Sequence, residues 1–246
     1  MADHSPVEQA AALLAGHVRR GRQTLSEPDA KALLKVLGIP VPQGIVVQDA
    51  AGAVSAAEAI GPPVAVKAVA FNLTHKSEAG GVICPVDTPA AAGAACGRIA
   101  ADVRRARPDI ALEGFLVEAY RPAAPEWILG LRVDPQFGPA IMLGLGGVHV
   151  DILQEVSFRL APLRERDIED LLSECRATRI LDGVRGRPPA DRDALKAAIR
   201  LLSNLAARPD IARSIAEIEI NPLAINERGV LALDALVVLS LQGDRT

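Results

Sequence analysis

The stretch at residues 216–234 constrains the fold of this chain more than any other. It contains EIEINPLAINERGVLALD, in which polar and apolar residues alternate over 217–221 and an apolar run at 230–233 follows the four residues Asn-Glu-Arg-Gly at 226–229. Alternation with a period of two is typical of strands, and a polar turn with glycine commonly joins two antiparallel strands. The stretch therefore predicts two short strands folded over the turn at 226–229.

The register of this hairpin decides which side chains lie on the same face. The simplest register pairs Asn226 with Gly229. It places Asn221 directly opposite Asp234, with their Cβ atoms within about 5.5 Å. A bulged turn, which a glycine at this position also permits, would shift the pairing by one residue and turn Asp234 to the other face. Glu219 shares the face of Asn221, because strand side chains repeat every second residue.

These three side chains offer oxygen atoms to a metal ion. The carboxylates of Glu219 and Asp234 and the amide oxygen of Asn221 are hard ligands of the kind that Mg²⁺ prefers. Mg²⁺ bound together with nucleotide phosphates needs only a few of them, since phosphates and water complete its shell. The alternative is a surface hairpin whose acidic residues are merely solvated. The hairpin alone leaves both interpretations open.

The composition excludes several classes of protein. Half of the 246 residues are apolar, which excludes a disordered chain, and a net charge of −3 with 2% aromatic residues argues against a nucleic-acid partner. The three cysteines show no C-x-x-C spacing, and the N-terminus has neither the charge nor the apolar run of a secretory signal. No apolar stretch approaches the ~18 residues of a membrane span. We therefore expect a cytoplasmic protein without a membrane or nucleic-acid partner.

Capping and alternation patterns predict a mixture of helices and strands. Ser5 with Glu8 opens the first helix, and a second capping pattern at 26–29 opens the next, which Gly38 ends. Because strands and helices do not alternate regularly, the predicted fold class is α+β, with two lobes rather than one doubly wound sheet. Helices are expected at 6–20, 30–37, 89–105, 165–177 and 191–207, together with a short alanine-rich helix that ends at residue 60. Strands are expected at 44–48, 64–69, 82–86, 114–118, 127–133 and 140–145.

The expected domain organisation has three segments. Residues 1–42 are N-terminal helices that pack on the C-terminal lobe, residues 43–116 form the first lobe, and residues 117–246 form the second lobe with the hairpin. Proline-bearing joints at 40–43 and 117–125 mark the boundaries. The middle segment is then an insertion.

Lys67 and the loop that follows its strand are candidates for phosphate binding. Lys67 stands in the middle of the strand at 64–69, where a buried ammonium is costly without a partner. The loop at 71–81, FNLTHKSEAGG, combines hydroxyls, an ammonium, an imidazole and glycines whose backbone N–H groups can approach an anion closely. It lacks the P-loop pattern. The alternatives are an ordinary polar turn and an edge-strand lysine that discourages aggregation.

The remaining polar residues carry weaker signals. His75 in the loop can act as acid, base or nucleophile, while His149 is better explained as structural. The glycines at 144–147 are a weak phosphate signal, and the arginines at 185–187 suit an anion or water equally. Glu126 could reach a ribose. Asp134 can do no more than cap the turn at Pro135.

Taken together, these motifs resemble the ATP-grasp subunit of ADP-forming acyl-CoA synthetases and, more distantly, the β subunit of succinyl-CoA synthetase. The resemblance covers about residues 25–239 and rests on several motifs in the right order. They are VAVK at 64–67, HKSEAGGV at 75–82, VEAY at 117–120 followed by Glu126, DPQFGPAIMLGLGGV at 134–148, FRLAPL at 158–163, GVRGRP at 183–188 and EINPL at 219–223.

The resemblance implies an ATP-grasp fold in which two α+β lobes clamp ATP or ADP with Mg²⁺. It implies that Lys67 contacts the phosphates, that residues 117–120 line the adenine and that Glu126 binds the ribose. His75 would carry phosphate from a histidine on a companion subunit to ADP, and Glu219 would lie near the histidine that accepts the phosphoryl group. The implied nucleotide-binding residues are Lys67, Ser77, Gly80, Gly81, Val117, Glu118, Ala119, Tyr120 and Glu126, the metal ligands are Asn221 and Asp234, and the catalytic residues are His75 and Glu219.

The reaction implied by the resemblance is acyl-CoA + ADP + phosphate ⇌ carboxylic acid + CoA + ATP. The CoA-binding module and the catalytic-histidine module of the family are absent from these 246 residues. A CoA-binding, α-type ligase subunit with a phosphorylatable histidine is therefore expected as the partner in a hetero-oligomer. The alternative is a catalytically silent ATP-grasp module that senses nucleotide and binds a partner. A ligase acting alone ranks last, because no site for its carboxylate or amine substrate is visible.

Overall fold

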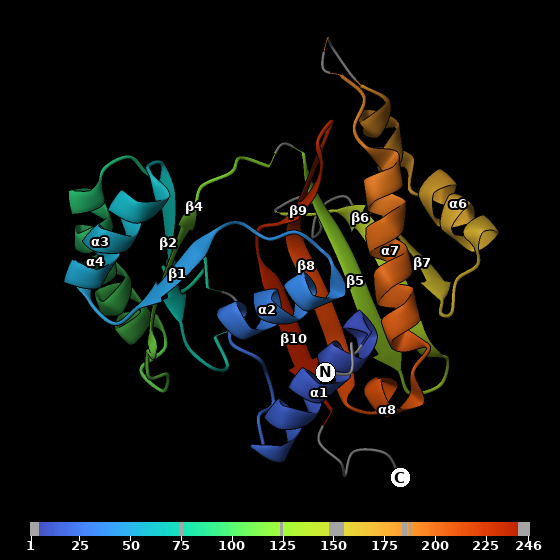
Figure 1. The fold of residues 1–246 in the computed structure, drawn as a ribbon, viewed down its shortest axis with the longest axis horizontal. Helices are drawn as coiled ribbons and strands as arrows, with labels where there is room; N and C mark the ends of the chain where they lie inside the picture. Colours follow the sequence, from blue (N-terminus) through green and yellow to red (C-terminus); the bar gives the residue numbers. More distant parts are fainter. Residues whose placement is uncertain are drawn as a thin grey trace. The chain divides into compact units, whose positions relative to one another are not determined.

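The computed structural model describes residues 5–73, 76–123, 125–147, 155–183, 186 and 188–240 (Figure 1). They fall into two compact units. Unit 1 spans Met1–Leu25, Asp29–Val41 and Ala123–Thr246, and unit 2 spans Ser26–Pro28 and Pro42–Pro122. Each unit is built around its own sheet.

Unit 2 is a four-stranded antiparallel sheet with the strand order β1-β4-β2-β3. Two helices pack on one face of this sheet, and side chains of Asp49 and Thr88 cap their N-termini. Buried alanines and valines of the helices and of β2 form its core. The elements are β1 (Gly44–Val47), α3 (Ala50–Ile60), β2 (Val64–Val69), β3 (Val82–Val86), α4 (Pro89–Ala106) and β4 (Gly114–Ala119).

Unit 1 is a six-stranded antiparallel sheet with the strand order β10-β8-β5-β6-β7, in which β9 also pairs with β8. Its elements are α1 (Pro6–Arg19), α2 (Glu27–Leu37), β5 (Glu126–Asp134), β6 (Gly138–Leu145), β7 (Val156–Leu160), α6 (Glu165–Glu174), the 3₁₀ helix η1 (Arg176–Asp182), α7 (Arg192–Ala206), α8 (Pro209–Ala212), β8 (Ile215–Asn226), β9 (Gly229–Ala232) and β10 (Ala235–Leu239).

The core of unit 1 lies on one face of its sheet. Alternate residues of the central strands, such as Leu129, Ile218 and Ile220, are fully buried there. They pack in one cluster with leucines and isoleucines of α1, α2, α6 and α7, and Figure 1 shows α1, α2 and α7 in front of the same sheet. Because strand side chains alternate, the residues between these core positions point to the opposite face.

The N-terminal segment of unit 1 is bonded to the last strands of the chain. Leu25 donates its backbone N–H to Val237 (3.0 Å), and Leu239 donates to Gln23 (2.8 Å). Lys31 on α2 donates to the carbonyl of Leu233 at 2.8 Å. The beginning and the end of the chain therefore complete the same sheet and core.

The structure moves one expected boundary and adds elements that the sequence patterns do not predict. The expected joint between residues 116 and 117 falls inside β4, because β4 pairs with both β1 and β2 and so belongs to unit 2. The helix expected at 165–177 ends at Glu174 and continues as η1. Strand β7 and the four-residue helix α8 are additional.

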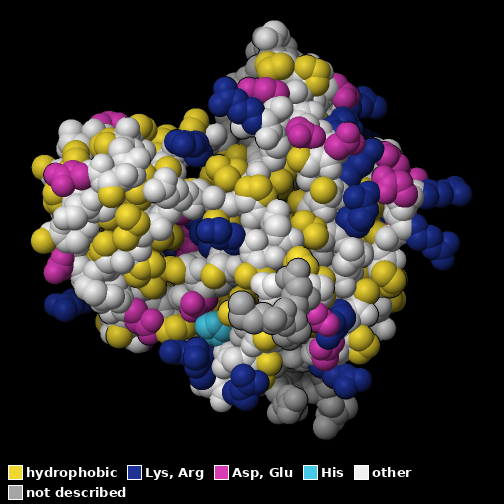
Figure 2. All heavy atoms as spheres, in the orientation of Figure 1, with side chains coloured by type: hydrophobic (Ala, Val, Ile, Leu, Met, Phe, Trp, Pro, Cys, Tyr) yellow, Lys and Arg dark blue, Asp and Glu magenta, His cyan; other side chains and the backbone are white. Residues whose placement is uncertain are grey.

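The surface of unit 1 over α6 and α7 is covered by mixed charges, as Figure 2 shows. Ion pairs join Arg200 to Glu165 and Lys196 to Glu169 there. Such exposed pairs contribute little stability individually. Among the described helices, none has the length and apolar character needed to cross a bilayer.

The three cysteines carry free thiols. Cys96 and Cys175 are buried, and burial raises the pKa of both thiols. The two buried thiols therefore remain protonated at neutral pH and behave as small apolar side chains.

The turn between β5 and β6 depends on Asp134, whose Oδ1 accepts the backbone N–H groups of Gln136 (2.8 Å) and Phe137 (2.9 Å). The hydrogen bond from Phe137, followed by that from Gln136, lowers the pKa of the Asp134 carboxyl. This confirms the predicted capping role.

We expect Asp134→Ala to lower the melting temperature at pH 7. A folded-state pKa below the unfolded value of about 3.9 means that the stabilisation is complete above that pH and is lost as the pH falls through the folded pKa. Thermal melts of both proteins between pH 7 and pH 3 should therefore converge at the acid end. A difference that grew toward low pH would contradict this account.

Candidate functional site

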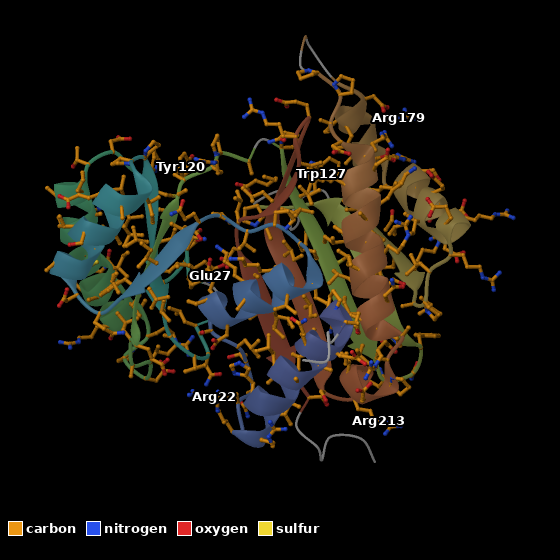
Figure 3. The ribbon with its side chains drawn as sticks, in the orientation of Figure 1. Arg22, Glu27, Tyr120, Trp127, Arg179 and Arg213 are labelled. Atoms are coloured by element: carbon orange, nitrogen blue, oxygen red, sulfur yellow. The ribbon has the colours of Figure 1, made fainter. Side chains whose placement is uncertain are left out.

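Unit 2 contains a buried cluster of four charged side chains. Lys67 Nζ lies 2.8 Å from Glu27 Oε1 and 2.6 Å from Glu118 Oε1, and Lys76 Nζ is bonded to Glu27 Oε2. All four residues are buried. Glu27, which is labelled in Figure 3, is the first residue of α2. It belongs to unit 2 together with its neighbours Ser26 and Pro28.

The strand pairing explains how Lys67 reaches Glu118. Lys67 pairs with Leu116 of β4, and Glu118 lies two residues further on the same face. Such diagonal neighbours on antiparallel strands are about 7–8 Å apart at their backbones, within reach of two long side chains. Val66 and Val117 point to the opposite face, into the core beneath α3 and α4. The interpretation of Lys67 as an edge-strand lysine is wrong, because β2 lies between β3 and β4.

The loop after β2 uses its glycine amides internally. Gly81 donates its N–H to the carbonyl of Lys76 (2.7 Å), and Gly80 donates to that of Ser77 (3.2 Å). Gly80 has φ +69°, and a Cβ there would lie 2.7 Å from the Cβ of Asp102. Both glycines therefore shape the loop, and the two amides expected to approach an anion are bonded within the loop itself.

The hairpin in unit 1 has the predicted register. Asn226 pairs with Gly229, and the pairing continues without a shift through Leu223 and Ala232. Asn221 donates its backbone N–H to the carbonyl of Asp234 at 3.3 Å. The bulged alternative is excluded, and Asn221 lies opposite Asp234 as expected.

A bulge against the neighbouring strand directs Asn221 toward the site. Trp127 pairs with Leu223 and Leu129 with Ile220, so Asn221 and the residue after it stand opposite a single residue of β5. Bulges of this kind redirect a side chain without breaking the sheet. The Asn221 Nδ2 donates to Glu219 Oε1 at 3.2 Å, and its Oδ1 accepts the N–H of Gly147 at 3.1 Å.

The turn at Gly146 and Gly147 lies between Asn221 and Glu126. Gly146 donates its N–H to the carbonyl of Glu126 at 2.8 Å. A Cβ on Gly147, which has φ +62°, would lie 1.8 Å from Glu126 Oε2, and a Cβ on Gly146 would lie 2.8 Å from Asn221 Oδ1. Only glycine fits at these two positions while the carboxylate and the amide keep their places.

Trp127 holds Glu126 in orientation. Its indole is fully buried in the core of unit 1, and Figure 3 marks it on β5. Successive strand residues point to opposite faces, so the buried indole directs Glu126 away from the core. Glu126, Glu219, Asn221 and Asp234 thus come together around the middle of β8, on elements of unit 1 alone.

The donor set of this cluster fits Mg²⁺ held jointly with a ligand. Among the described residues, no three His, Cys, Asp or Glu side chains are placed to hold a metal by themselves. Asn221 and Asp234 supply hard oxygens, and Asp234 Oδ1 also accepts the N–H of Ala235 at 2.7 Å. Mg²⁺ usually takes one or two protein oxygens and completes its shell with phosphates and water. Two donors are therefore compatible with Mg²⁺ bound through a phosphate ligand.

The predicted site residues fall into two groups that the structure describes separately. Lys67, Glu118 and the loop with Ser77 belong to unit 2, and the segment Val117 to Tyr120 is fixed by backbone bonds such as Tyr120 N–H to Pro63 (3.0 Å). His75, His149 and Arg185 lie outside the described residues. The first group contains Lys67, Ser77, Gly80, Gly81, Val117, Glu118, Ala119 and Tyr120, and the second contains Glu126, Glu219, Asn221 and Asp234.

Sequence reasoning missed three contributors. Glu27 was assigned only to a capping pattern, since nothing in its neighbourhood indicates a lysine 40 residues away. Lys76 was counted only as part of a polar loop. The Gly146 and Gly147 pair was rated a weak phosphate signal, although a double glycine after an apolar strand does indicate a tight turn or close approach of backbone to another group.

A comparison with known families identifies the class of protein. A family model described as "ATP-grasp domain" matches residues 16–239. The chain therefore belongs to the ATP-grasp proteins, in agreement with the α+β fold.

Individual relatives show to which group of ATP-grasp proteins the chain is similar in sequence and structure. The chain is 40% identical over 216 residues to the "Acetate--CoA ligase [ADP-forming] I subunit beta" of Pyrococcus furiosus, which covers 87% of this chain and 91% of the relative. A solved structure of a Ca. Korarchaeum cryptofilum acetyl-coenzyme A synthetase, in complex with coenzyme A and Ca-AMPCP, matches with a TM-score of 0.87 and 36% identity over 94% of this chain and 99% of the other.

A second structure of that synthetase contains coenzyme A and Mg-AMPPCP. It matches with a TM-score of 0.78 and 34% identity over 94% of this chain and 99% of the other, and its phosphohistidine segment is described as pointing towards the nucleotide binding site. This chain thus belongs to the family of the β subunits of ADP-forming acetate–CoA ligases, as the sequence motifs indicated.

We expect Lys67→Met to lower the free energy of unfolding by about 3 kcal/mol, because two buried carboxylates lose a shared ammonium. Lys196→Met is the matched control, since its partner Glu169 is about half exposed. The control should cost less than about 1 kcal/mol. Urea unfolding of both variants checks this, and equal losses would show that the buried cluster adds nothing beyond a surface pair.

Proposed function

We propose that this chain is the nucleotide-binding subunit of an ADP-forming acyl-CoA synthetase. Together with a CoA-binding subunit it would catalyse acyl-CoA + ADP + phosphate ⇌ carboxylic acid + CoA + ATP. The observation that carries the proposal is the convergence of Glu126, Glu219, Asn221 and Asp234 around the middle of β8, in a chain of this family. The step assigned to this subunit breaks the N–P bond of a phosphohistidine and forms a bond from that phosphorus to a terminal oxygen of ADP.

In unit 1, Asn221 and Asp234 would hold Mg²⁺. Bound Mg²⁺ would neutralise charge on the nucleotide phosphates, as in other phosphoryl-transfer sites. Glu126, fixed against Gly147, is assigned to the ribose hydroxyls, which a carboxylate accepts as hydrogen-bond donors. Glu219 is assigned to the histidine that exchanges the phosphoryl group, because a carboxylate that accepts one imidazole N–H fixes the tautomer and leaves the other nitrogen to react.

In unit 2, Lys67 is assigned to the phosphates, with Ser77, Gly80 and Gly81 in the adjoining loop. Val117 to Tyr120 is assigned to the adenine. His75 is assigned to the relay of phosphate from the companion subunit to ADP, because imidazole nitrogen is a competent phosphoryl acceptor and donor. The Lys67 charge would stabilise negative charge that develops on the transferred group.

The companion is proposed to be an α-type subunit that binds CoA and carries a phosphorylatable histidine. Support comes from the relative named as a β subunit and from the solved structure with coenzyme A and a phosphohistidine segment. We also propose a cytoplasmic location, for which the free thiols of all three cysteines provide support.

We expect Mg-ATP to raise the melting temperature of the chain and Asp234→Ala to abolish that rise. Ligand present at 100 times its Kd stabilises the folded state by about 2.7 kcal/mol, and removal of a metal ligand should weaken binding enough to remove most of this. Differential scanning fluorimetry with and without Mg-ATP measures the shift.

Asp193→Ala is the control, because Asp193 is an exposed carboxylate on α7 of the same unit. It should keep the full shift. An undiminished shift in Asp234→Ala would remove the hairpin from the nucleotide site.

We expect the chain, mixed with its companion subunit, acetyl-CoA, ADP and phosphate, to form ATP. His75→Ala should reduce the rate at least about 10³-fold, because removal of a covalent relay interrupts the transfer of phosphate to ADP. A coupled luciferase assay measures ATP. Turnover of the variant at the wild-type rate would eliminate His75 as the relay while leaving nucleotide binding intact.

A further inference from the structure

We infer that Glu27 is a positioning residue whose single carboxylate holds Lys67 and Lys76 side by side as a paired cation for the nucleotide phosphates. The inference deepens the proposed function and rests on it. The sequence motifs give Glu27 no role beyond helix capping. It enters the site only through its contacts in unit 2.

The two oxygens of Glu27 serve different lysines. Oε1 accepts from Lys67 Nζ at 2.8 Å, and Oε2 accepts from Lys76 Nζ. The Glu27 side chain is only 2% exposed, and those of the lysines are 8% and 10% exposed. Both ammonium groups are therefore bonded to the two oxygen atoms of the Glu27 carboxylate and are largely shielded from bulk water.

Glu27 does more than supply a partner for Lys67. Lys67 already has Glu118 as a partner at 2.6 Å. What Glu27 adds is the connection between the two lysines, which come from β2 and from the loop that follows β2. Two ammonium groups that are bonded to the same carboxylate lie close enough to repel each other. The negative charge of the shared carboxylate offsets that repulsion.

The position of Glu27 in the chain makes it a firm anchor. It is the first residue of α2, where a negative charge is favoured by the helix dipole. A lysine side chain has four rotatable bonds and loses its geometry readily when a partner is removed. Without Glu27, Lys76 would lose a carboxylate partner, and Lys67 would lose the contact that links it to Lys76.

Glu27→Gln tests the inference in the full chain. Isothermal titration calorimetry with Mg-ATP and with adenosine separates phosphate contacts from base and ribose contacts. We expect the Kd for Mg-ATP to rise at least tenfold and the Kd for adenosine to change less than twofold. Removal of a negative charge would by itself tighten phosphate binding, so weaker binding identifies lost positioning.

Glu58→Gln is the matched control, since Glu58 is an exposed carboxylate on α3 of the same unit. It should leave both affinities unchanged. Unchanged or tighter Mg-ATP binding in Glu27→Gln would overturn the inference, and so would an equal loss for both ligands, which indicates a general structural role.

If Glu27→Gln does not fold, Glu27→Asp replaces it. Aspartate keeps the charge but is one methylene shorter, so from the same backbone position its carboxylate does not reach both ammonium groups. We expect a several-fold weaker Mg-ATP affinity with unchanged adenosine affinity, and equal affinities to wild type would overturn the inference. Failure of the proposed function can be distinguished from failure of this inference. If the proposed function is wrong, the wild-type chain itself will not bind Mg-ATP.

Discussion

Alternation of the side chains from Ile218 to Asn221 along β8 is the constraint on which unit 1 depends. Ile218 and Ile220 are fully buried beneath the helices, so the residues between and beyond them must point to the other face. The pairing of β8 with β5, β9 and β10 is thereby fixed, since a slip by one residue would expose the isoleucines and bury Glu219. Core packing and the arrangement of the site oxygens are two results of one register.

In unit 2, charged side chains rather than apolar packing fill one face of the central strand β2. One face of β2 packs under α3 and α4, while the other carries Lys67, which is also buried. An ammonium is retained there because Glu27 and Glu118 approach it within hydrogen-bonding distance. Buried ion pairs stabilise a fold less than apolar packing of the same volume does. Their presence at the centre of this sheet is consistent with the phosphate role that we propose for Lys67.

The sequence allowed local features to be predicted and left distant contacts undetermined. The hairpin register followed from side-chain alternation and a four-residue turn, and the boundaries of β2 followed from VAVKAV between a proline turn and a polar loop. The partnership of Glu27 with Lys67 spans 40 positions and leaves no local trace. Likewise, β7 alternates too briefly to be distinguished from a loop until β6 is in place beside it. Local patterns made the hairpin oxygens, Lys67 and the loop with His75 candidates, whereas the segment 117–120 and the separate role of each residue came only from the family resemblance.

The bonding of the N-terminal segment to β10 has a consequence for synthesis on the ribosome. Apart from three residues, unit 2 is one continuous segment, Pro42–Pro122, and can fold as soon as that segment has emerged. Leu25, by contrast, bonds to Val237, so the sheet of unit 1 cannot close until the segment with Val237 has been translated. During that interval the apolar faces of α1 and α2 are without their core. The folding order of this chain should therefore be the middle first and the two ends together, last.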